Sequence, residues 1–139
     1  MAYAFPSPGW VDALVVILNS DTRYAQVARG WEGDIVFAVQ PDGSPSREED
    51  ADRIYLDLWH GKCRSGSLYP AKGQAAPQAT FVLSATRANL LRILSGDLDP
   101  MQAMLTRKLQ VHGNMGYMLR NVPVVLDFVR CCRRVEIAA

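Results

Sequence analysis

The sequence lacks an excess of charge of either sign, and it lacks an apolar run long enough to cross a membrane. Lys and Arg number 15 against 14 Asp and Glu, so the formal net charge of +1 gives no general attraction to nucleic acid. The longest apolar stretch, at residues 11–18, is shorter than the roughly 20 residues of a membrane-spanning helix and includes Asp12. The first residues of the chain lack the basic flank and apolar core of a signal peptide. We therefore expect a cytoplasmic protein that does not bind nucleic acid.

Cysteine and histidine are scarce, and neither type forms a recognisable site. Cys63, Cys131 and Cys132 are an odd number with an adjacent pair, which predicts free thiols rather than a disulfide framework. His60 and His112 fall in predicted strands, and no cluster of His, Cys, Asp or Glu has the spacing of metal ligands. The sequence has no phosphate-binding loop, dinucleotide fingerprint or nucleophile elbow. We therefore expect no enzyme, no metal and no cofactor.

Length and patterning predict one α+β domain over residues 1–139. The hydrophobic share of 49% is enough for a core. Apolar residues at helical spacing predict helices that begin after the capping residues Ser7, Asp21, Thr86 (or Ser84) and Asp99, and a last helix from Pro123. The predicted strands are residues 34–40, 53–60, 62–69, 79–86 and 108–114, with exposed loops at 41–50 and 70–78. Because the strands are grouped, we expect a five-stranded, largely antiparallel or mixed sheet with helices over one face.

The methionines are concentrated in one part of the sequence. Apart from the initiator, all of them fall between residues 101 and 118, and Gly113 and Gly116 lie among them. Methionine fills irregular gaps in cores, and it also lines surfaces that adapt to varied apolar ligands. Composition alone favours the first interpretation. The two glycines favour the second, because they would leave room beside the methionines.

Two neighbouring segments carry a longer pattern. Residues 96–101 read Gly-Asp-Leu-Asp-Pro-Met, and residues 107–115 read Arg-Lys-Leu-Gln-Val-His-Gly-Asn-Met. This pair resembles the hallmark of the sterol carrier protein lipid-binding domain family, which is Gly-x-Leu-x-Pro, a helix, then Gly-Lys-Leu-x-(Val/Ile)-x-Gly-(Asp/Asn)-Met. Earlier segments also fit, so the resemblance covers nearly the whole chain. One departure is Arg107, where the family usually has glycine.

The resemblance implies a sheet and helices that enclose an apolar cavity or tunnel and carry lipids without catalysis. The implied ligands are fatty acids, acyl-CoA, sterol-like molecules or isoprenoids. Arginine outnumbers lysine, which is typical of a GC-rich bacterial genome, and most bacteria make no sterols. By position, the predicted ligand-binding residues are Leu90, Leu94, Met101, Met104, Leu105, Leu109, Met115, Met118, Leu119, Val122, Val125, Leu126 and Val129.

Other interpretations of the same residues remain open. Arg130, Arg133 and Arg134 either complement the dipole of the last helix or contact an anionic membrane transiently. A filled core would instead indicate an accessory or protein-interaction module, with the last helix around Phe128 docking a partner or a second copy of the chain. An enzymatic alternative is a thioesterase-like activity that uses Asp57 or His112.

Overall fold

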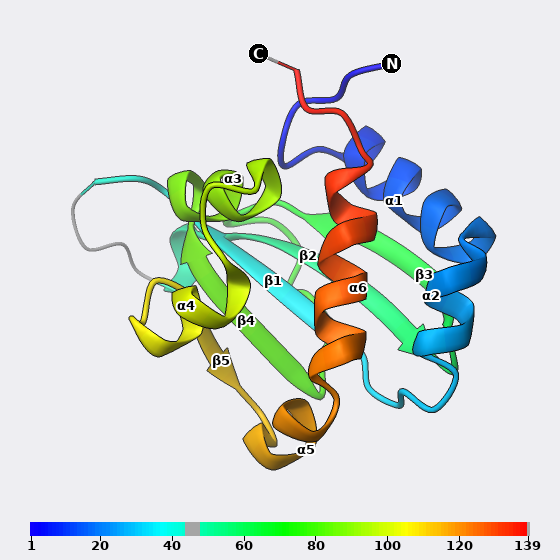
Figure 1. Ribbon diagram of the computed structural model, residues 1–139. Helices are drawn as coiled ribbons and strands as arrows, with labels where there is room; N and C mark the ends of the chain where they lie inside the picture. The colour runs from blue at the N-terminus through cyan, green and yellow to red at the C-terminus, as the bar shows by residue number, and fades with distance from the viewer. Residues whose placement is uncertain (44–47, 139) are drawn as a thin grey trace.

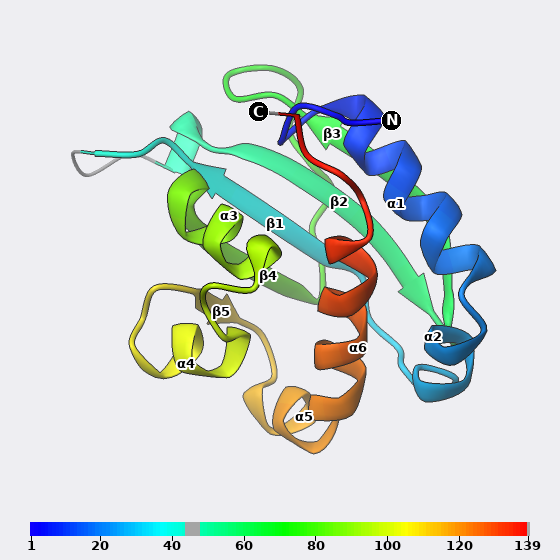
Figure 2. The same ribbon diagram turned by 45° about the horizontal axis from the view of Figure 1, so that its top comes forward.

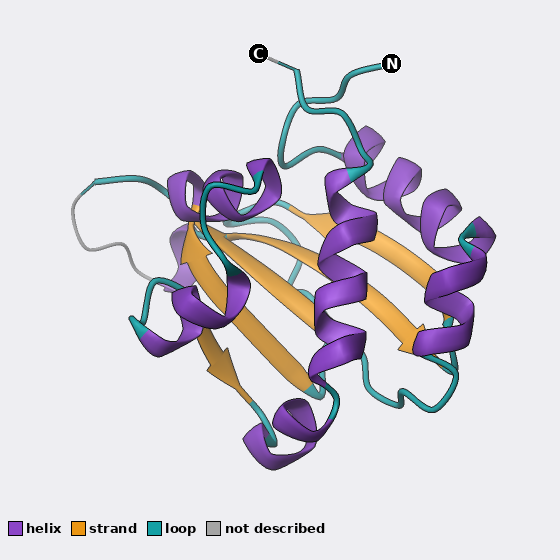
Figure 3. Cartoon of the chain, in the orientation of Figure 1, coloured by secondary structure: helices purple, strands orange, loops and turns teal. Residues whose placement is uncertain are grey.

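A five-stranded sheet forms one layer of the molecule, and the α-helices pack over one of its faces (Figures 1 and 3). The structure is a computed structural model and describes residues 1–43 and 48–138. The grouped strands and one-sided helical cover are the α+β architecture that the sequence predicts, so the predicted fold class is confirmed. None of the helices in the described residues is long and apolar enough to cross a membrane.

Five of the six α-helices in the described residues begin after a capping side chain, and the sixth, which starts at Val122, has no side-chain cap. The side chains of Ser7, Asp21, Thr86 and Asp99 each accept a hydrogen bond from a backbone N–H in the first turn, as predicted, and Asn114 does the same for a helix predicted only as a short turn. The helices are α1 (Pro8–Ser20), α2 (Thr22–Val27), α3 (Arg87–Ser95), α4 (Pro100–Leu105), α5 (Met115–Arg120) and α6 (Val122–Arg133), and η1 (Glu48–Asp50) is a 3-10 turn.

The sheet has the order β3-β2-β1-β4-β5. Its strands are β1 (Ile35–Gln40), β2 (Asp52–Trp59), β3 (Lys62–Tyr69), β4 (Phe81–Thr86) and β5 (Gln110–His112). The central pair β1–β4 is parallel and the other pairs are antiparallel. In β1, Phe37 lies opposite Ile54 of β2 and Leu83 of β4, and this register places one apolar row on the helical face.

Three strands are shorter than the sequence predicts, β1 by one residue and the other two by more. The strand predicted from residue 79 begins at Phe81, because the backbone N–H and hydroxyl of Thr80 both donate to Asp34 Oδ1, at 2.7 and 2.9 Å. The strand predicted over 108–114 is only Gln110–His112, since β5 lies at the sheet edge and pairs only with β4. Of the loop predicted over 41–50, residues 44–47 lie outside the described residues.

The turn between β2 and β3 also supports α2. His60 and Gly61 both have positive φ, at 50° and 81°, as a two-residue type I′ hairpin turn requires. The His60 backbone N–H donates to the carbonyl of Trp31 at 2.7 Å. A Cβ atom on Gly61 would lie 2.6 Å from the carbonyl oxygen of Ala25 in α2. The hairpin end and the backbone of α2 are thus in direct contact, and only glycine fits there.

We predict that Gly61→Ala lowers the free energy of unfolding by about 2–4 kcal/mol, because it combines a disfavoured φ with a backbone clash. Urea denaturation followed by circular dichroism measures the change. Gly30→Ala is the control, since a Cβ there meets no atom within 4 Å, and we expect a change within about 0.5 kcal/mol. Equal effects of the two substitutions would contradict the close approach of α2.

Candidate functional site

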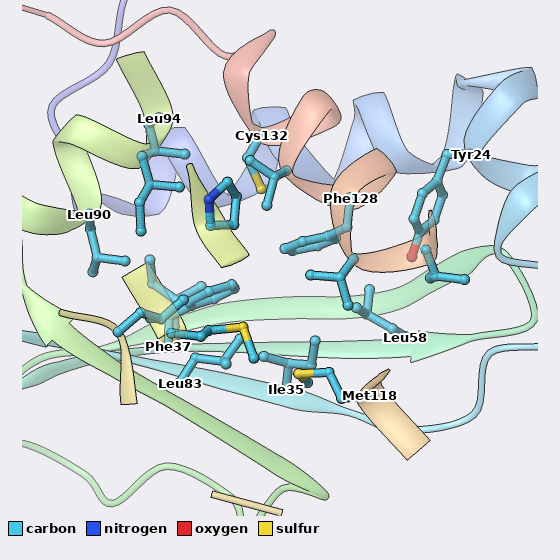
Figure 4. A pocket seen from close by; sticks show the side chains of 18 of the residues that line it. Tyr24, Ile35, Phe37, Leu58, Leu83, Leu90, Leu94, Met118, Phe128 and Cys132 are labelled. Atoms are coloured by element: carbon cyan, nitrogen blue, oxygen red, sulfur yellow. The ribbon is translucent and has the colours of Figure 1, made fainter. Parts of the chain in front are cut away.

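An apolar cavity lies between the sheet and the helical layer (Figure 4). Its floor comes from β1, β2 and β4, and its cover from α3, α4, α5 and α6. Aromatic rings of the N-terminal half close one side. The lining residues are Phe5, Trp10, Tyr24, Trp31, Ile35, Phe37, Ile54, Leu58, Leu83, Leu90, Ile93, Leu94, Pro100, Met104, Leu109, Met118, Val124, Val125, Phe128, Val129 and Cys132.

The cavity is only partly open. The cavity volume is about 70 Å³. This is well below the roughly 300–1,000 Å³ of small-molecule sites, so the wall side chains lie too close together to admit a long lipid as they stand. A long ligand therefore needs side chains such as Met104 and Met118 to move aside.

Helix α6 presents one face to the cavity and the opposite one to α2. Its wall residues, Val124, Val125, Phe128, Val129 and Cys132, follow the spacing of one helical face. The Phe128 ring stacks on Phe37 of β1, with centroids 5.8 Å apart and planes 8° apart. This stack spans the space between α6 and the sheet and defines the height of the cavity there.

The other face of α6 is held by a network of ion pairs. Asp127 is buried and accepts hydrogen bonds from Arg130 at 2.8 and 3.2 Å, and Arg23 of α2 lies 3.2 Å away. Arg130 also donates to Asp21 Oδ1 at 2.7 Å, and Arg134 donates to Asp21 Oδ2 at 2.8 Å. Because Asp21 is the N-cap of α2, the network joins the start of α2 to the middle and end of α6.

Hydrogen bonding lowers the pKa of Asp21 well below its ordinary value. The largest cause is the hydrogen bond from Arg130, followed by the backbone hydrogen bond from Tyr24, and partial burial opposes both. A carboxylate with a lowered pKa in the folded state stabilises that state above its unfolded pKa, and this stabilisation is lost as the pH falls.

Of the residues predicted to bind a ligand, some line the cavity and others do not. The wall contains Leu90, Leu94, Met104, Leu109, Met118, Val125 and Val129. The others lie outside it. Met101 and Val122 are half-buried, whereas Leu105, Met115, Leu119 and Leu126 are exposed. The physical reason is helix rotation, because Leu105, Leu119 and Leu126 each follow a wall residue and point about 100° away from it.

The glycines near the methionines have a different role from the one predicted. Gly113 has a φ of +136°, and a Cβ atom on it would lie 2.7 Å from the carbonyl oxygen of Thr80. Gly113 thus lets the end of β5 approach β4, and neither Gly113 nor Gly116 lines the cavity. Met104 and Met118 are in the wall, but the room beside them is not made by glycine.

Sequence reasoning missed the aromatic part of the wall. Trp31 packs on Phe81 and on Tyr117, with ring centroids 5.4 and 5.1 Å apart, and so joins the start of β1 to β4 and α5. Phe5 and Trp10 meet edge to face at 4.8 Å. The alternation of Ile35, Phe37 and Val39 was a signal for a core-facing row. No local pattern indicates that this row meets residues from the beginning of the chain.

The wall holds few polar groups. The Trp10 indole nitrogen is buried and has no hydrogen-bond partner among the described residues. Burial raises the pKa of the Tyr24 hydroxyl above its ordinary value, and burial raises the pKa of the Cys132 thiol well above its ordinary value. All three cysteines of the chain are free and buried. At neutral pH the wall is therefore uncharged, and the indole N–H is a donor that lacks an acceptor.

The predicted membrane-contacting arginines have intramolecular partners. Arg130 and Arg134 bind Asp21, and Arg133 Nε donates to the carbonyl of Ile93 at 3.0 Å. The structure therefore gives these residues a role in joining helices. Phe128, the residue considered for docking a second copy, is buried inside the cavity.

No catalytic arrangement forms around the residues considered for one. Asp57 lies on β2 and pairs with Arg64 at 3.0 Å, whereas His112 lies on β5. Two strands separate β2 from β5, which places these residues roughly 14 Å apart or more. Asp21, Asp127 and Cys131 lie close enough to hold a metal ion, but the arginines already neutralise both carboxylates.

An open α+β sheet whose helical cover leaves an uncharged apolar cavity defines the class of small lipid-binding and lipid-transfer domains. Residues 15–125 match the SCP-2 sterol transfer family, and the chain belongs to that family. No curated protein sequence matches the chain.

Solved structures agree with this assignment. The crystal structure of a sterol carrier protein 2 is 30% identical with a TM-score of 0.80, over 94% of this chain and 98% of that one. A conserved protein of Thermus thermophilus, described as a possible sterol carrier protein, is 26% identical with a TM-score of 0.78, over 99% of this chain and 97% of that one. Sterol carrier protein 2 of Aedes aegypti, solved with palmitate, has the same fold at 17% identity and a TM-score of 0.53, over 88% and 92% of the two chains.

We predict that Asp21→Asn lowers the free energy of unfolding at pH 7 by about 1–2 kcal/mol, because asparagine keeps the cap but loses the ion pairs. The wild type should lose stability as the pH falls below about 4, the ordinary pKa of an aspartate, because the pKa of Asp21 in the folded state lies well below that value, and the variant should lose less. Urea titrations at several pH values measure both. The control is Asp12→Asn, an exposed residue of α1 without an ion pair to any described residue; matching pH profiles for both variants would exclude Asp21 as the source.

Proposed function

We propose that this protein binds an acyl or isoprenoid lipid in its apolar cavity and carries it without catalysing a reaction. The observation that carries this proposal is the cavity itself, an uncharged space of about 70 Å³ between sheet and helices whose wall is apolar and includes the flexible side chains of Met104 and Met118. The family supports lipid binding and transfer in general. The Aedes aegypti relative, which was solved with palmitate, supports a fatty acid as the first ligand to test.

The expected affinity is moderate. Burial of each CH₂ group stabilises a complex by about 0.8 kcal/mol, so a long chain contributes on the order of 10 kcal/mol. Association and ordering oppose binding by an estimated 4–15 kcal/mol. Moving wall side chains such as Met104 and Met118 to widen the cavity adds to this cost. Micromolar binding with loose selectivity follows, and flexible methionine walls suit a carrier that accepts several lipids.

The unpaired indole of Trp10 favours a ligand with a polar group. A buried donor without an acceptor costs about 1–3 kcal/mol, and a carboxylate or ester oxygen that reaches it removes this cost. The ligand is then an amphipathic lipid whose oxygen lies near Trp10 and whose chain extends toward α4 and α5. A plain hydrocarbon would lack this contact.

The experiment that tests the proposal is native mass spectrometry of the purified protein, followed by extraction and identification of any released lipid. A bound lipid at near-stoichiometric amount would establish the site and its ligand class. A ligand-free mass, with no uptake after incubation with fatty acids, acyl-CoA and isoprenoids, would contradict the proposal and favour a filled core.

We predict that Met104→Trp weakens binding of a fluorescent fatty acid at least tenfold, because the larger ring occupies the gap. The matched control is Leu126→Trp, the same kind of substitution at a position that is 42% exposed and outside the wall. A fluorescence titration without vesicles measures both, and circular dichroism confirms folding. Equal binding by the two variants would place the ligand elsewhere.

We predict that Trp10→Phe reduces the affinity for dodecanoic acid about tenfold more than the affinity for dodecane, since it removes the indole donor but keeps an aromatic ring. Competition against a fluorescent fatty acid measures the two affinities. Comparing two ligands on one variant cancels any general loss of packing. An equal reduction for both ligands would show that the indole N–H does not meet the ligand's polar group.

A further inference from the structure

Four large apolar side chains are exposed on consecutive elements beside the cavity. The exposed fractions are 80% for Leu105 of α4, 38% for Met115 and 56% for Leu119 of α5, and 42% for Leu126 of α6. Figures 1 and 2 both show α4, β5, α5 and the beginning of α6 together along one edge of the molecule. We call this the α4–α6 edge, and it consists of residues 100–126.

Three of the exposed residues are the sequence neighbours of residues that line the cavity. Met104, Met118 and Val125 line the cavity, and the residue that follows each of them in the sequence is an exposed leucine. Each of the three helices thus presents apolar surface both inside the cavity and at the outer surface. Apolar side chains exposed in such a group mark a contact site more often than scattered single ones do.

The sequence of this edge contains cations and no carboxylate, and the exposed N-cap Asp99 comes directly before it. Between residues 100 and 126 the sequence contains Arg107, Lys108 and Arg120 but no Asp or Glu. All three cations are exposed, and none forms an ion pair with a described residue. This separates them from Arg130 and Arg134, which bind Asp21. Unpaired cations interleaved with exposed leucines are the composition of a surface that contacts anionic lipid headgroups.

Arg107 stands in a backbone conformation that disfavours it. Its φ is +60°, in the left-handed region that glycine adopts without cost. A non-glycine residue in this region costs roughly 1 kcal/mol or more relative to glycine. Its exposed guanidinium has no intramolecular partner among the described residues that would offset this cost. The strained backbone of Arg107 is thus accompanied by an exposed positive charge on its side chain.

From these observations we infer that the α4–α6 edge docks the protein on the surface of an anionic phospholipid bilayer, with its leucines in the interface and its cations at the headgroups. The dispersed, protruding leucines suit insertion among lipids better than contact with a flat protein partner. Three cations and a few side chains give weak, reversible attachment, as a carrier requires. Docking here would place the helices that cover the cavity against the source of its ligand.

The test is co-sedimentation of the full chain with sucrose-loaded vesicles of phosphatidylcholine alone or with 30% phosphatidylglycerol. We expect binding to the anionic vesicles that weakens as sodium chloride is added, and little binding to phosphatidylcholine. The variant Arg107→Gln/Lys108→Gln/Arg120→Gln should bind roughly a hundredfold more weakly, since each cation near such a surface contributes about fivefold. Leu105→Ser/Leu119→Ser should also lose binding, at unchanged net charge.

Matched controls separate this edge from general charge and hydrophobicity. Arg29→Gln/Lys62→Gln/Arg92→Gln removes the same charge from exposed residues elsewhere, and Val16→Ser removes an apolar side chain of α1 that is 66% exposed. Both controls should bind like the wild type. Loss of binding in the controls, retention in the edge variants, or no binding of the wild type to anionic vesicles would each overturn the inference.

The outcome is independent of the proposed cavity function. The edge variants should keep wild-type affinity for a fluorescent fatty acid in the absence of vesicles, because their substitutions lie outside the wall. If the wild type binds no soluble lipid yet sediments with anionic vesicles, the proposed function fails and the docking surface stands. A wild type that is a dimer, and that Leu119→Ser converts to a monomer without vesicle binding by either form, would assign the edge to a second copy instead.

Discussion

Helix α6 is tied to the start of α2 by the ion pairs of Arg130 and Arg134 with Asp21 and of Asp127 with Arg23. These pairs lie on the face of α6 that points away from the cavity wall. On the cavity side, Phe128 meets Phe37 and holds the helix above the sheet instead of letting it collapse onto it. Apolar packing alone would favour closing the gap, because any unfilled space forfeits contacts. The ion pairs on the face of α6 that points away from the cavity stabilise the fold although the cavity is left unfilled.

Much of the fold could be predicted because its signals are local. Capping by Ser7, Asp21, Thr86 and Asp99 requires only a few neighbouring residues, and so do the strand alternation and the hairpin turn at Gly61. The predicted start of the fourth strand at residue 79 was wrong. The strand begins later because Thr80 forms a hydrogen bond with Asp34, which is far away in the sequence. Local periodicity contains no information about such partners.

Only part of the cavity wall could be predicted from the sequence. The methionine cluster and the family pattern led to Met104, Met118 and the last helix. Adjacent residues in a short helix, however, differ by about 100° in direction, and a list of apolar positions cannot tell inside from outside without the helix axis. Leu105, Leu119 and Leu126 were therefore assigned to the wall and lie on the surface. The aromatic side, from Phe5 to Trp31, was missed because it reaches the cavity only through tertiary contact.

The pairing of Asp21 with Arg130 joins residues that are 109 positions apart, and Asp21 with Arg134 joins residues 113 apart. During synthesis, α1, α2 and the strands β1 to β4 are made well before α6, which begins at Val122. The apolar row of the sheet then has no cover on the side that later becomes the cavity. Such an intermediate exposes the surface that nascent-chain chaperones bind, and it is open to aggregation until the last turns of the chain arrive. The cavity is thus closed only when the last helix of the chain has been made.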